Sequence, residues 1–251
     1  MPGDEDQDWF VPVERRPGAA ARLFVLPHAG AGPAAVAAFG AAVRPDIEVW
    51  ALNLPGRQAR QAEPPRTDLA GLTADLAAWL RRRDPRPYAL FGYCGGALLA
   101  YLVAEQCAPT HLFVGSQAAP DVALIPRRLH ALPGERFWEV VLDQGGVAPE
   151  LAELVELRPV FEPAIRADFE LYAGYRRHGG RLDVPVTVLF GREDRALGRG
   201  ALLGWRRRTT GRLRLADLPG GHWLLDDATA ETAALVGDTV LAGLATPAGV
   251  S

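Results

Sequence analysis

One cysteine of this sequence lies where a nucleophile could be activated. It belongs to the segment GYCGG, residues 92–96, between a strand-like run at 88–93 and a helical pattern at 95–105. The spacing is that of a nucleophile elbow, G-x-nucleophile-x-G. Here a sharp strand-to-helix turn exposes the nucleophile, and the helix N-terminus favours a thiolate and an oxyanion. We predict that Cys94 is this nucleophile; the alternative for the segment alone is a buried cysteine in a glycine-rich turn.

An acid and a histidine follow this cysteine in the order expected of a catalytic triad. Asp194 comes shortly after a strand-like run at 184–190, and His222 follows another at 212–218. Nucleophile, acid, histidine is the chain order of the α/β-hydrolases. The alternatives are a turn-forming role for Asp194, with Glu193 as the neighbouring candidate acid, and a capping role for His222. Because both residues follow strand ends, we predict that His222 is the base and that Asp194 orients it.

A glycine-rich loop could stabilise negative charge on a reacting oxygen. The segment PHAGAG, residues 27–32, follows a strand-like run at 22–26. A loop there can present a backbone N–H to an oxyanion, and Gly95, next to the nucleophile, can present a second. His28 and Tyr93 adjoin these donors in the chain and are the candidate residues of the substrate pocket. We expect His28 to hold the oxyanion loop rather than to take part in proton transfer.

The elements that must position these residues alternate between strand and helix. Short apolar runs indicate strands at 22–26, 47–52, 88–93, 111–115, 184–190 and 212–218. Apolar residues at helical spacing indicate helices at 72–80 and 95–105. Runs this apolar, alternating with helices, are typical of a mostly parallel sheet covered on both faces. We therefore predict an α/β fold with a central sheet flanked by helices.

The alternation defines one domain with two irregular regions. Residues 1–20 are acidic and contain prolines, so we expect a flexible N-terminal arm, and residues 21–251 should form a single domain. The segment from about 120 to 175 contains prolines between helical patterns at 137–142, 150–157 and 164–175. We interpret this segment as a helical lid above the sheet; the alternative is a pair of ordinary crossover helices.

Composition excludes several classes of protein. The chain has 251 residues, of which 49% are hydrophobic and 23% charged, which is unlike a disordered protein. Its net charge of −3 argues against nucleic-acid binding. The absence of lysine excludes Schiff-base catalysis and pyridoxal phosphate anchoring, and two cysteines cannot form a four-cysteine zinc site. With no signal-peptide pattern and no apolar window of roughly 18 residues, we expect a cytoplasmic protein without membrane contact.

The combined motifs resemble the type II thioesterases, the stand-alone α/β-hydrolases of polyketide and nonribosomal peptide biosynthesis. The similar segments are PHAGAG, LNLPGRQAR, YALFGYCGGALLAYLVAE, APELAELVELRPVFEPAIRADFELYAGYR, FGREDRAL and GGHWLL. The resemblance implies an α/β-hydrolase fold with a helical lid, no metal, no bound cofactor and a monomer. It also implies thioester substrates on the phosphopantetheine arms of acyl or peptidyl carrier proteins. By motif position, Cys94 is the nucleophile, His222 the base and Asp194 its orienter, while Ala29 and Gly95 supply the oxyanion N–H groups.

The sequence departs from the family pattern at the elbow. The family usually has G-H-S-M-G, whereas Tyr93, Cys94 and Gly95 here replace histidine, serine and methionine. Leu102 also stands where a glutamate is common. The change from methionine to Gly95 removes bulk beside the nucleophile, so we expect a differently shaped acyl pocket.

The cysteine leaves the fate of the acyl group open. Attack of a thiolate on a thioester forms another thioester, which keeps the acyl group activated. Water can then release a free acid, and we expect this hydrolysis as the main activity. The alternative is a transferase that passes the acyl or aminoacyl group to a second carrier or to an amine. A second alternative is an inactive homologue that only binds carrier proteins, although the presence of both Asp194 and His222 argues against it.

Overall fold

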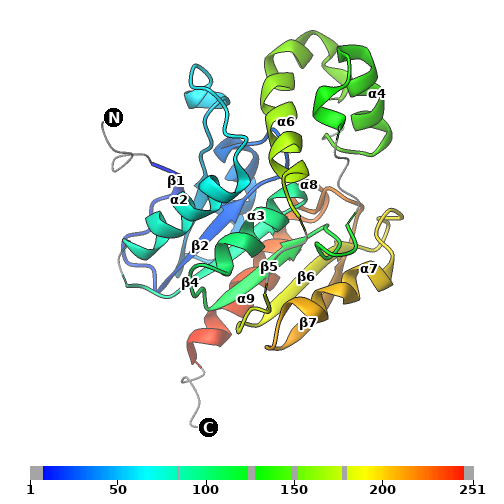
Figure 1. Cartoon of the computed structure of the whole chain (residues 1–251). Helices are drawn as coiled ribbons and strands as arrows, with labels where there is room; N and C mark the ends of the chain where they lie inside the picture. The colour runs from blue at the N-terminus through cyan, green and yellow to red at the C-terminus, as the bar shows by residue number, and fades with distance from the viewer. Residues whose placement is uncertain (1–7, 84, 124–127, 148–151, 177–179, 246–251) are drawn as a thin grey trace.

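A seven-stranded sheet forms the centre of the molecule (Figure 1). The computed structural model describes residues 8–245 apart from 84, 124–127, 148–151 and 177–179. Its strands are β1 (Phe10–Glu14), β2 (Ala21–Leu26), β3 (Ile47–Leu52), β4 (Tyr88–Tyr93), β5 (His111–Gly115), β6 (Val186–Gly191) and β7 (Leu213–Leu218). All six strands predicted from apolar runs are present, with ends that differ by two residues at most. The predicted α/β-hydrolase fold is confirmed.

The order of the strands brings the candidate residues to one edge of the sheet. The order is β1-β3-β2-β4-β5-β6-β7, and every neighbouring pair from β3 to β7 is parallel. The carboxyl ends of six strands therefore lie at the same edge. The loops after β2, β4, β6 and β7 carry the PHAGAG segment, Cys94, Asp194 and His222, respectively.

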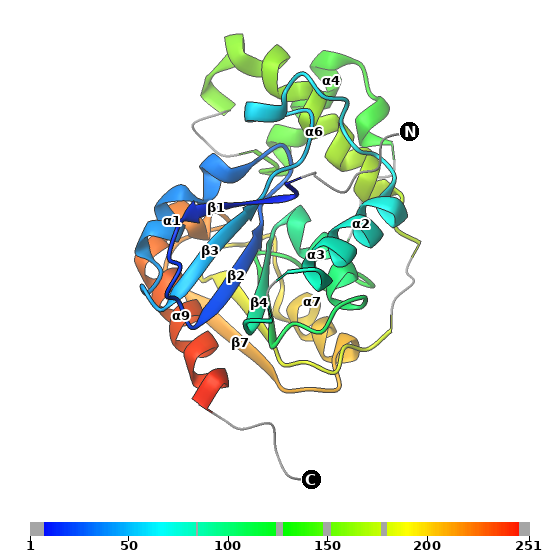
Figure 2. The ribbon, with the colours of Figure 1, turned by 90° about the vertical axis from the view of Figure 1, so that its left-hand side faces the viewer.

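Helices cover both faces of the sheet (Figure 2). On one side lie α2 (Leu69–Arg81), α3 (Gly95–Ala104) and α7 (Arg199–Leu203); on the other lie α1 (Ala37–Ala42) and α9 (Thr229–Ala245), with α8 (Leu224–Asp227) leading into α9. The short 3-10 helices are η2 (Pro33–Val36), η3 (Gln58–Arg60), η4 (Leu129–Ala131), η5 (Val155–Leu157) and η6 (Gly204–Arg208). Within the described residues, no helix has both the length and the apolar character needed to cross a membrane.

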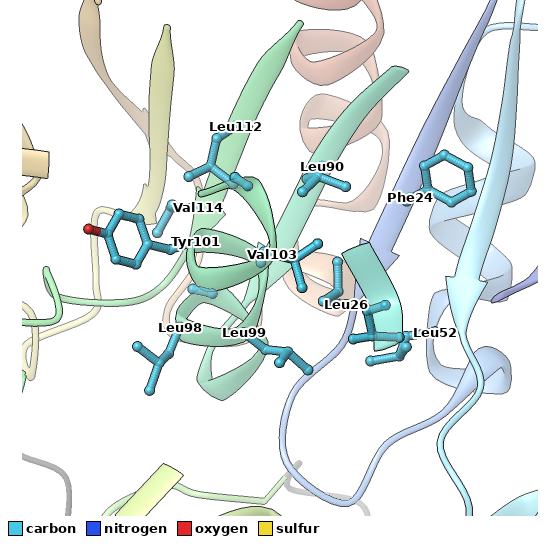
Figure 3. Close-up of a cluster of buried hydrophobic side chains, with 14 of the residues drawn as sticks. Phe24, Leu26, Leu52, Leu90, Leu98, Leu99, Tyr101, Val103, Leu112 and Val114 are labelled. Atoms are coloured by element: carbon cyan, nitrogen blue, oxygen red, sulfur yellow. The ribbon is translucent and has the colours of Figure 1, made fainter. Parts of the chain in front are cut away.

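Helix α3 joins the nucleophile to the hydrophobic core. Its side chains Leu98, Leu99, Tyr101 and Val103 lie among residues of the neighbouring strands, including Phe24, Leu26, Leu52, Leu90, Leu112 and Val114 (Figure 3). Each of these side chains is at least 96% buried. Because burial of such side chains provides much of the free energy of folding, the start of α3 is held firmly against the sheet.

The expectation of a flexible arm at 1–20 is wrong for the part that forms β1. This strand pairs antiparallel with β3 at the edge of the sheet, and Phe10 is fully buried. The ring of Phe10 packs 5.1 Å from that of Phe24 and 5.3 Å from that of Trp79, measured between centroids. Pro12 is tolerated because an edge strand has N–H groups without a ladder partner. Residues 1–7 lie outside the described part of the chain.

Between β5 and β6 a group of helices stands above the carboxyl edge of the sheet (Figure 1). We call residues 128–176 the helical insertion; it contains η4, α4 (Gly134–Asp143), η5 and α6 (Arg158–Ala173). The pattern at 164–175 predicted only the second half of α6, because Pro163 lies inside the helix, where proline is usually excluded. Of the helix predicted at 150–157, residues 155–157 form η5, and 150–151 lie outside the described residues.

Candidate active site

Cys94 occupies a strained turn between β4 and α3. Its backbone angles are φ 52° and ψ −125°, a conformation that side-chain-bearing residues rarely adopt. A Cβ atom at Gly96 would lie 2.1 Å from the Leu26 carbonyl oxygen, and one at Gly92 would lie 2.4 Å from the Ala97 Cα atom. Both flanking positions therefore require glycine. The strand, turn and helix expected around a nucleophile elbow are all present.

The loops after β6 and β7 bring Asp194 and His222 together. The Asp194 Oδ2 atom lies 3.1 Å from His222 Nδ1, and the carboxylate side chain is only 3% exposed. Burial alone would raise the pKa of Asp194, but the hydrogen bond and the charge of His222 hold it below its usual range. Asp194 is therefore an anion that can fix the orientation of the ring.

His222 interacts with Cys94 as well as with Asp194. Burial lowers its pKa, but the hydrogen bonds to Asp194 and Cys94 outweigh burial and raise the pKa to about 10. The imidazole therefore holds its proton at neutral pH. Because Nδ1 faces Asp194, the other ring nitrogen, Nε2, is left for the cysteine, which is the arrangement that proton transfer to and from sulfur requires.

The backbone of His222 is held by two hydroxyl groups. Its carbonyl oxygen accepts a hydrogen bond of 2.8 Å from Ser116 Oγ and another from the Tyr93 hydroxyl. The sequence suggested that Tyr93 lines the substrate pocket, but this side chain is only 1% exposed. Tyr93 positions His222 instead. Sequence reasoning missed Ser116, although its place directly after β5, at the same sheet edge, could have marked it.

His28 is the other residue expected in the substrate pocket, and its side chain also packs elsewhere. Its ring packs edge-on against Trp223, with centroids 4.9 Å apart. Burial and the neighbouring His222 lower the pKa of His28 to about 4, so the ring is neutral at physiological pH. This packing supports the other expectation for His28, that it holds the loop after β2 rather than transfers protons.

Cys94 opens into a cavity of about 170 Å³. Both predicted oxyanion donors, Ala29 and Gly95, line it together with Cys94 and His222. The remaining described lining residues are Leu98, Gln117, Gln144, Gly145, Gly146, Phe169 and Tyr172. The last five belong to the helical insertion, which therefore forms one side of the cavity.

A buried ion pair links the helical insertion to the oxyanion loop. Arg57 donates two hydrogen bonds to the Asp168 carboxylate, of 2.6 and 2.8 Å, and the two side chains are 4% and 2% exposed. Asp168 also accepts the Gly30 backbone N–H at 2.7 Å, and Arg57 donates to the Ala31 carbonyl oxygen at 3.2 Å. These contacts fix the loop that carries Ala29. Sequence reasoning gave neither Arg57 nor Asp168 a role, although both lie in segments that resemble the thioesterases.

Comparisons with known proteins point to one family. A family model described as "Thioesterase domain" matches residues 21–238. The chain is 29% identical over 224 residues to the gramicidin S biosynthesis protein GrsT of Aneurinibacillus migulanus, covering 86% of this chain and 88% of that protein. It is 30% identical over 232 residues to the thioesterase PikA5 of Streptomyces venezuelae, covering 87% and 80%. The structure of the type II thioesterase BorB from the borrelidin biosynthetic cluster superposes with a TM-score of 0.84 at 29% identity, covering 93% and 98%.

Proposed function

The chain belongs to the thioesterase family, and from this premise we propose that it hydrolyses acyl thioesters through an acyl group held on Cys94. The substrates are carried on the phosphopantetheine arms of carrier proteins in polyketide or nonribosomal peptide biosynthesis. The pathways named for GrsT and BorB support this assignment. The observation that carries the chemistry is that Cys94 and His222 line one cavity and that Asp194 lies 3.1 Å from the His222 ring.

The first half of the reaction transfers the acyl group to the enzyme. The Cys94 sulfur attacks the thioester carbonyl carbon while the thiol proton is held by His222. The backbone N–H groups of Ala29 and Gly95 donate to the carbonyl oxygen as it becomes an oxyanion. When the carbon–sulfur bond of the substrate breaks, His222 gives its proton to the departing pantetheine sulfur. The products are S-acyl-Cys94 and a carrier with a free thiol.

The second half releases the acid. His222, now neutral, takes a proton from a water molecule, whose oxygen attacks the acyl carbon on Cys94. The same backbone N–H groups stabilise the second oxyanion. The bond to sulfur then breaks, the acid leaves, and the proton taken from water remains on the pair of His222 and Cys94. Asp194 keeps the ring oriented in both halves and stays ionised throughout.

The helical insertion has a supporting place in this proposal. We assign it the role of a lid, because Phe169 and Tyr172 lie over the cavity beside the nucleophile. The reaction requires no metal or organic cofactor, since the substrate brings its own activated bond. We expect a cytoplasmic monomer whose partners are acyl or peptidyl carrier proteins.

The sulfur of Cys94 favours a second candidate, acyl transfer. An acyl group on a cysteine remains a thioester, so passing it to another thiol is nearly thermoneutral, whereas a serine ester would be less activated. A carrier thiol or an amine could then replace water in the second half of the reaction. The enzyme would shuttle acyl or aminoacyl groups by the same triad.

One experiment separates these fates. The protein is incubated with a carrier bearing a labelled acyl group and with a second, unloaded carrier. Free acid as the labelled product supports hydrolysis, whereas label on the second carrier, beyond uncatalysed exchange, contradicts simple hydrolysis and supports transfer. Cys94→Ala should reduce either product to background while the unfolding temperature stays unchanged. Full activity of this variant would contradict the mechanism. If the unaltered protein forms neither product, the remaining interpretation is an inactive homologue that only binds carrier proteins.

The variant Cys94→Ser provides a companion measurement. It keeps a nucleophile but makes the intermediate an oxoester, which reacts less readily with thiols. We expect transfer to fall more than hydrolysis. Equal loss of the two activities would indicate that sulfur has no special part in the second half of the reaction.

A further inference from the structure

We propose that Tyr172, seated against Gly95, restricts the cavity beside Cys94 to short acyl groups. This inference rests on the proposed function, because it names the class of acyl group that the same cavity accepts. It assigns to two residues, one at the start of α3 and one on α6, a joint role in substrate selection.

The ring of Tyr172 fills the space that a side chain at position 95 would need. A Cβ atom built on Gly95 would lie 2.4 Å from Tyr172 Cε2, 2.8 Å from Cζ and 3.0 Å from the hydroxyl oxygen. Real Cβ atoms essentially never approach other atoms to within 3.0 Å. The sequence suggested that glycine leaves extra room beside the nucleophile. The aromatic ring takes up this room instead, so the glycine permits the ring to approach.

The ring cannot easily move aside. Tyr172 is 7% exposed, and its neighbours on the same face of α6 are fixed. Ile165, seven residues earlier, packs on Gly30, where an added Cβ atom would lie 2.4 Å from its Cγ1. Asp168, four residues earlier, is held by Arg57. Residues at these spacings share one helix face, so the whole face is pinned to the loops below it.

The size of the cavity indicates the length of the acyl group. Its volume is about 170 Å³, close to the roughly 150 Å³ of an engineered cavity that holds one benzene molecule. A group of about six non-hydrogen atoms therefore fills the space beside the sulfur. A longer acyl chain would have to extend past Tyr172 or out of the open side of the cavity. Leu98 and Phe169 give this space an apolar lining that suits a short aliphatic group.

The test measures kcat/KM for a series of acyl-pantetheine thioesters: acetyl, butanoyl, hexanoyl, octanoyl and decanoyl. The unaltered protein should prefer the short members. Tyr172→Val removes most of the ring and should raise the ratio of decanoyl to butanoyl kcat/KM by about tenfold or more, since one methylene in a fitted pocket is worth at least that much. The matched control is Leu171→Ala, which truncates the adjacent, fully buried residue of α6 outside the described lining. It should leave the ratio unchanged.

A second pair of variants tests the contact with Gly95 independently. Gly95→Ala keeps the backbone N–H but places a methyl group against the ring, so it should lower kcat/KM for every substrate. Adding Tyr172→Val to Gly95→Ala should restore at least part of this loss. If kcat/KM of the double variant falls by the product of the factors measured for Gly95→Ala and Tyr172→Val alone, the two residues do not share space in solution and the inference fails.

The outcomes distinguish this inference from the proposed function. If the unaltered protein releases acid from decanoyl thioesters as fast as from butanoyl thioesters, the inference is overturned while thioester hydrolysis stands. If no member of the series is cleaved or transferred, the proposed function itself fails. Should Tyr172→Val not fold, Tyr172→Leu, which also removes the ring, replaces it in both tests with the same expected outcomes.

Discussion

Cys94 and Cys107 place the same side chain in two different environments. Cys94 is half-buried, lies at the cavity and interacts with His222. Cys107 is buried just after the end of α3; its thiol donates to the Val103 carbonyl oxygen at 3.1 Å, and burial raises its pKa. Only the first environment suits a nucleophile, because the thiolate is the reactive form.

Limited alkylation should distinguish the two cysteines. Iodoacetamide is expected to modify Cys94 well before Cys107, because each unit by which the pKa of Cys107 is raised lowers its thiolate fraction about tenfold. Mass mapping of a partial reaction measures the order. Equal modification of both residues in the folded protein would contradict the assignment of Cys94 as the activated thiol.

The pH dependence of acylation should follow the raised pKa of His222. Its value rises from 6.5 to about 10, so the imidazolium that donates a proton to the leaving sulfur is present below about pH 10 and is lost above it. Burst kinetics should therefore show acylation that is constant from neutral pH to about 9 and then declines. In Asp194→Asn the decline should begin at lower pH. An acylation rate that rises through the ordinary histidine range would be inconsistent with this protonation state.

The sequence predicted that Cys94, Asp194 and His222 would meet, because each follows the end of a strand in a parallel sheet. Their supports were harder to predict. The roles of Ser116 and Tyr93 depend on a carbonyl oxygen of His222 that approaches them only in the folded chain. A residue type and a spacing do not reveal which backbone atom a hydroxyl group will reach.

At the scale of elements, α6 supports the loop at 27–32, which carries Ala29. Asp168→Asn should cost about 3–5 kcal/mol of unfolding free energy, because it leaves the buried Arg57 charge without its partner. Chemical denaturation measures this loss. The variant should also lose activity, since the Gly30 N–H loses a charged acceptor and the loop carrying Ala29 becomes less well fixed.

A double variant separates stability from positioning. Replacing Arg57 with methionine and Asp168 with leucine should recover much of the stability, because apolar pairs of similar volume often replace buried ion pairs without loss. Activity should stay low, since no acceptor for Gly30 is restored. Recovery of both properties together would show that the ion pair contributes only to folding.

Local patterns predicted most elements but not this link between them. Arg57 and Asp168 are 111 residues apart in the chain, and nothing near either residue indicates the other. Pro163 likewise concealed the first half of α6, because proline normally ends a helical pattern. Helices α1 and α9 went unpredicted, although α9 begins at Thr229 and has Glu231 in its first turn, which are signals of a helix start.

At the scale of the whole molecule, β1 closes one edge of the sheet and completes an aromatic cluster. Phe10→Ala should destabilise the protein by about 3–5 kcal/mol, the usual cost of removing a buried phenylalanine. Denaturant unfolding monitored by tryptophan fluorescence measures this effect, since Trp79 is a neighbour of Phe10. The kcat/KM of the folded protein should remain unchanged, because this edge lies away from the cavity; a large fall in kcat/KM would contradict that separation.

The order of strands could be anticipated only in part. Six apolar runs revealed the parallel strands, because a strand buried on both faces has few polar residues. The edge strand β1 escaped prediction, since Pro12 and the acidic residues before it are typical of loops. Its place beside β3 follows from contacts with Trp79 and Phe24, which belong to other parts of the chain.

The contacts that hold this face of α6 also constrain how a substrate can reach the Cys94 sulfur. An outward movement of α6 would separate Asp168 from Arg57 and from the Gly30 N–H group. It would also withdraw Ile165 from Gly30 and Tyr172 from Gly95. Such a motion would free the loop that carries Ala29 from the contacts that fix it. Residues 144–146 also line the cavity but take no part in the contacts of Asp168, Ile165 and Tyr172, and Gly145 holds a φ of 61° there, which glycine adopts without strain. Substrate entry past residues 144–146 would therefore leave the contacts between α6 and the loop after β2 in place.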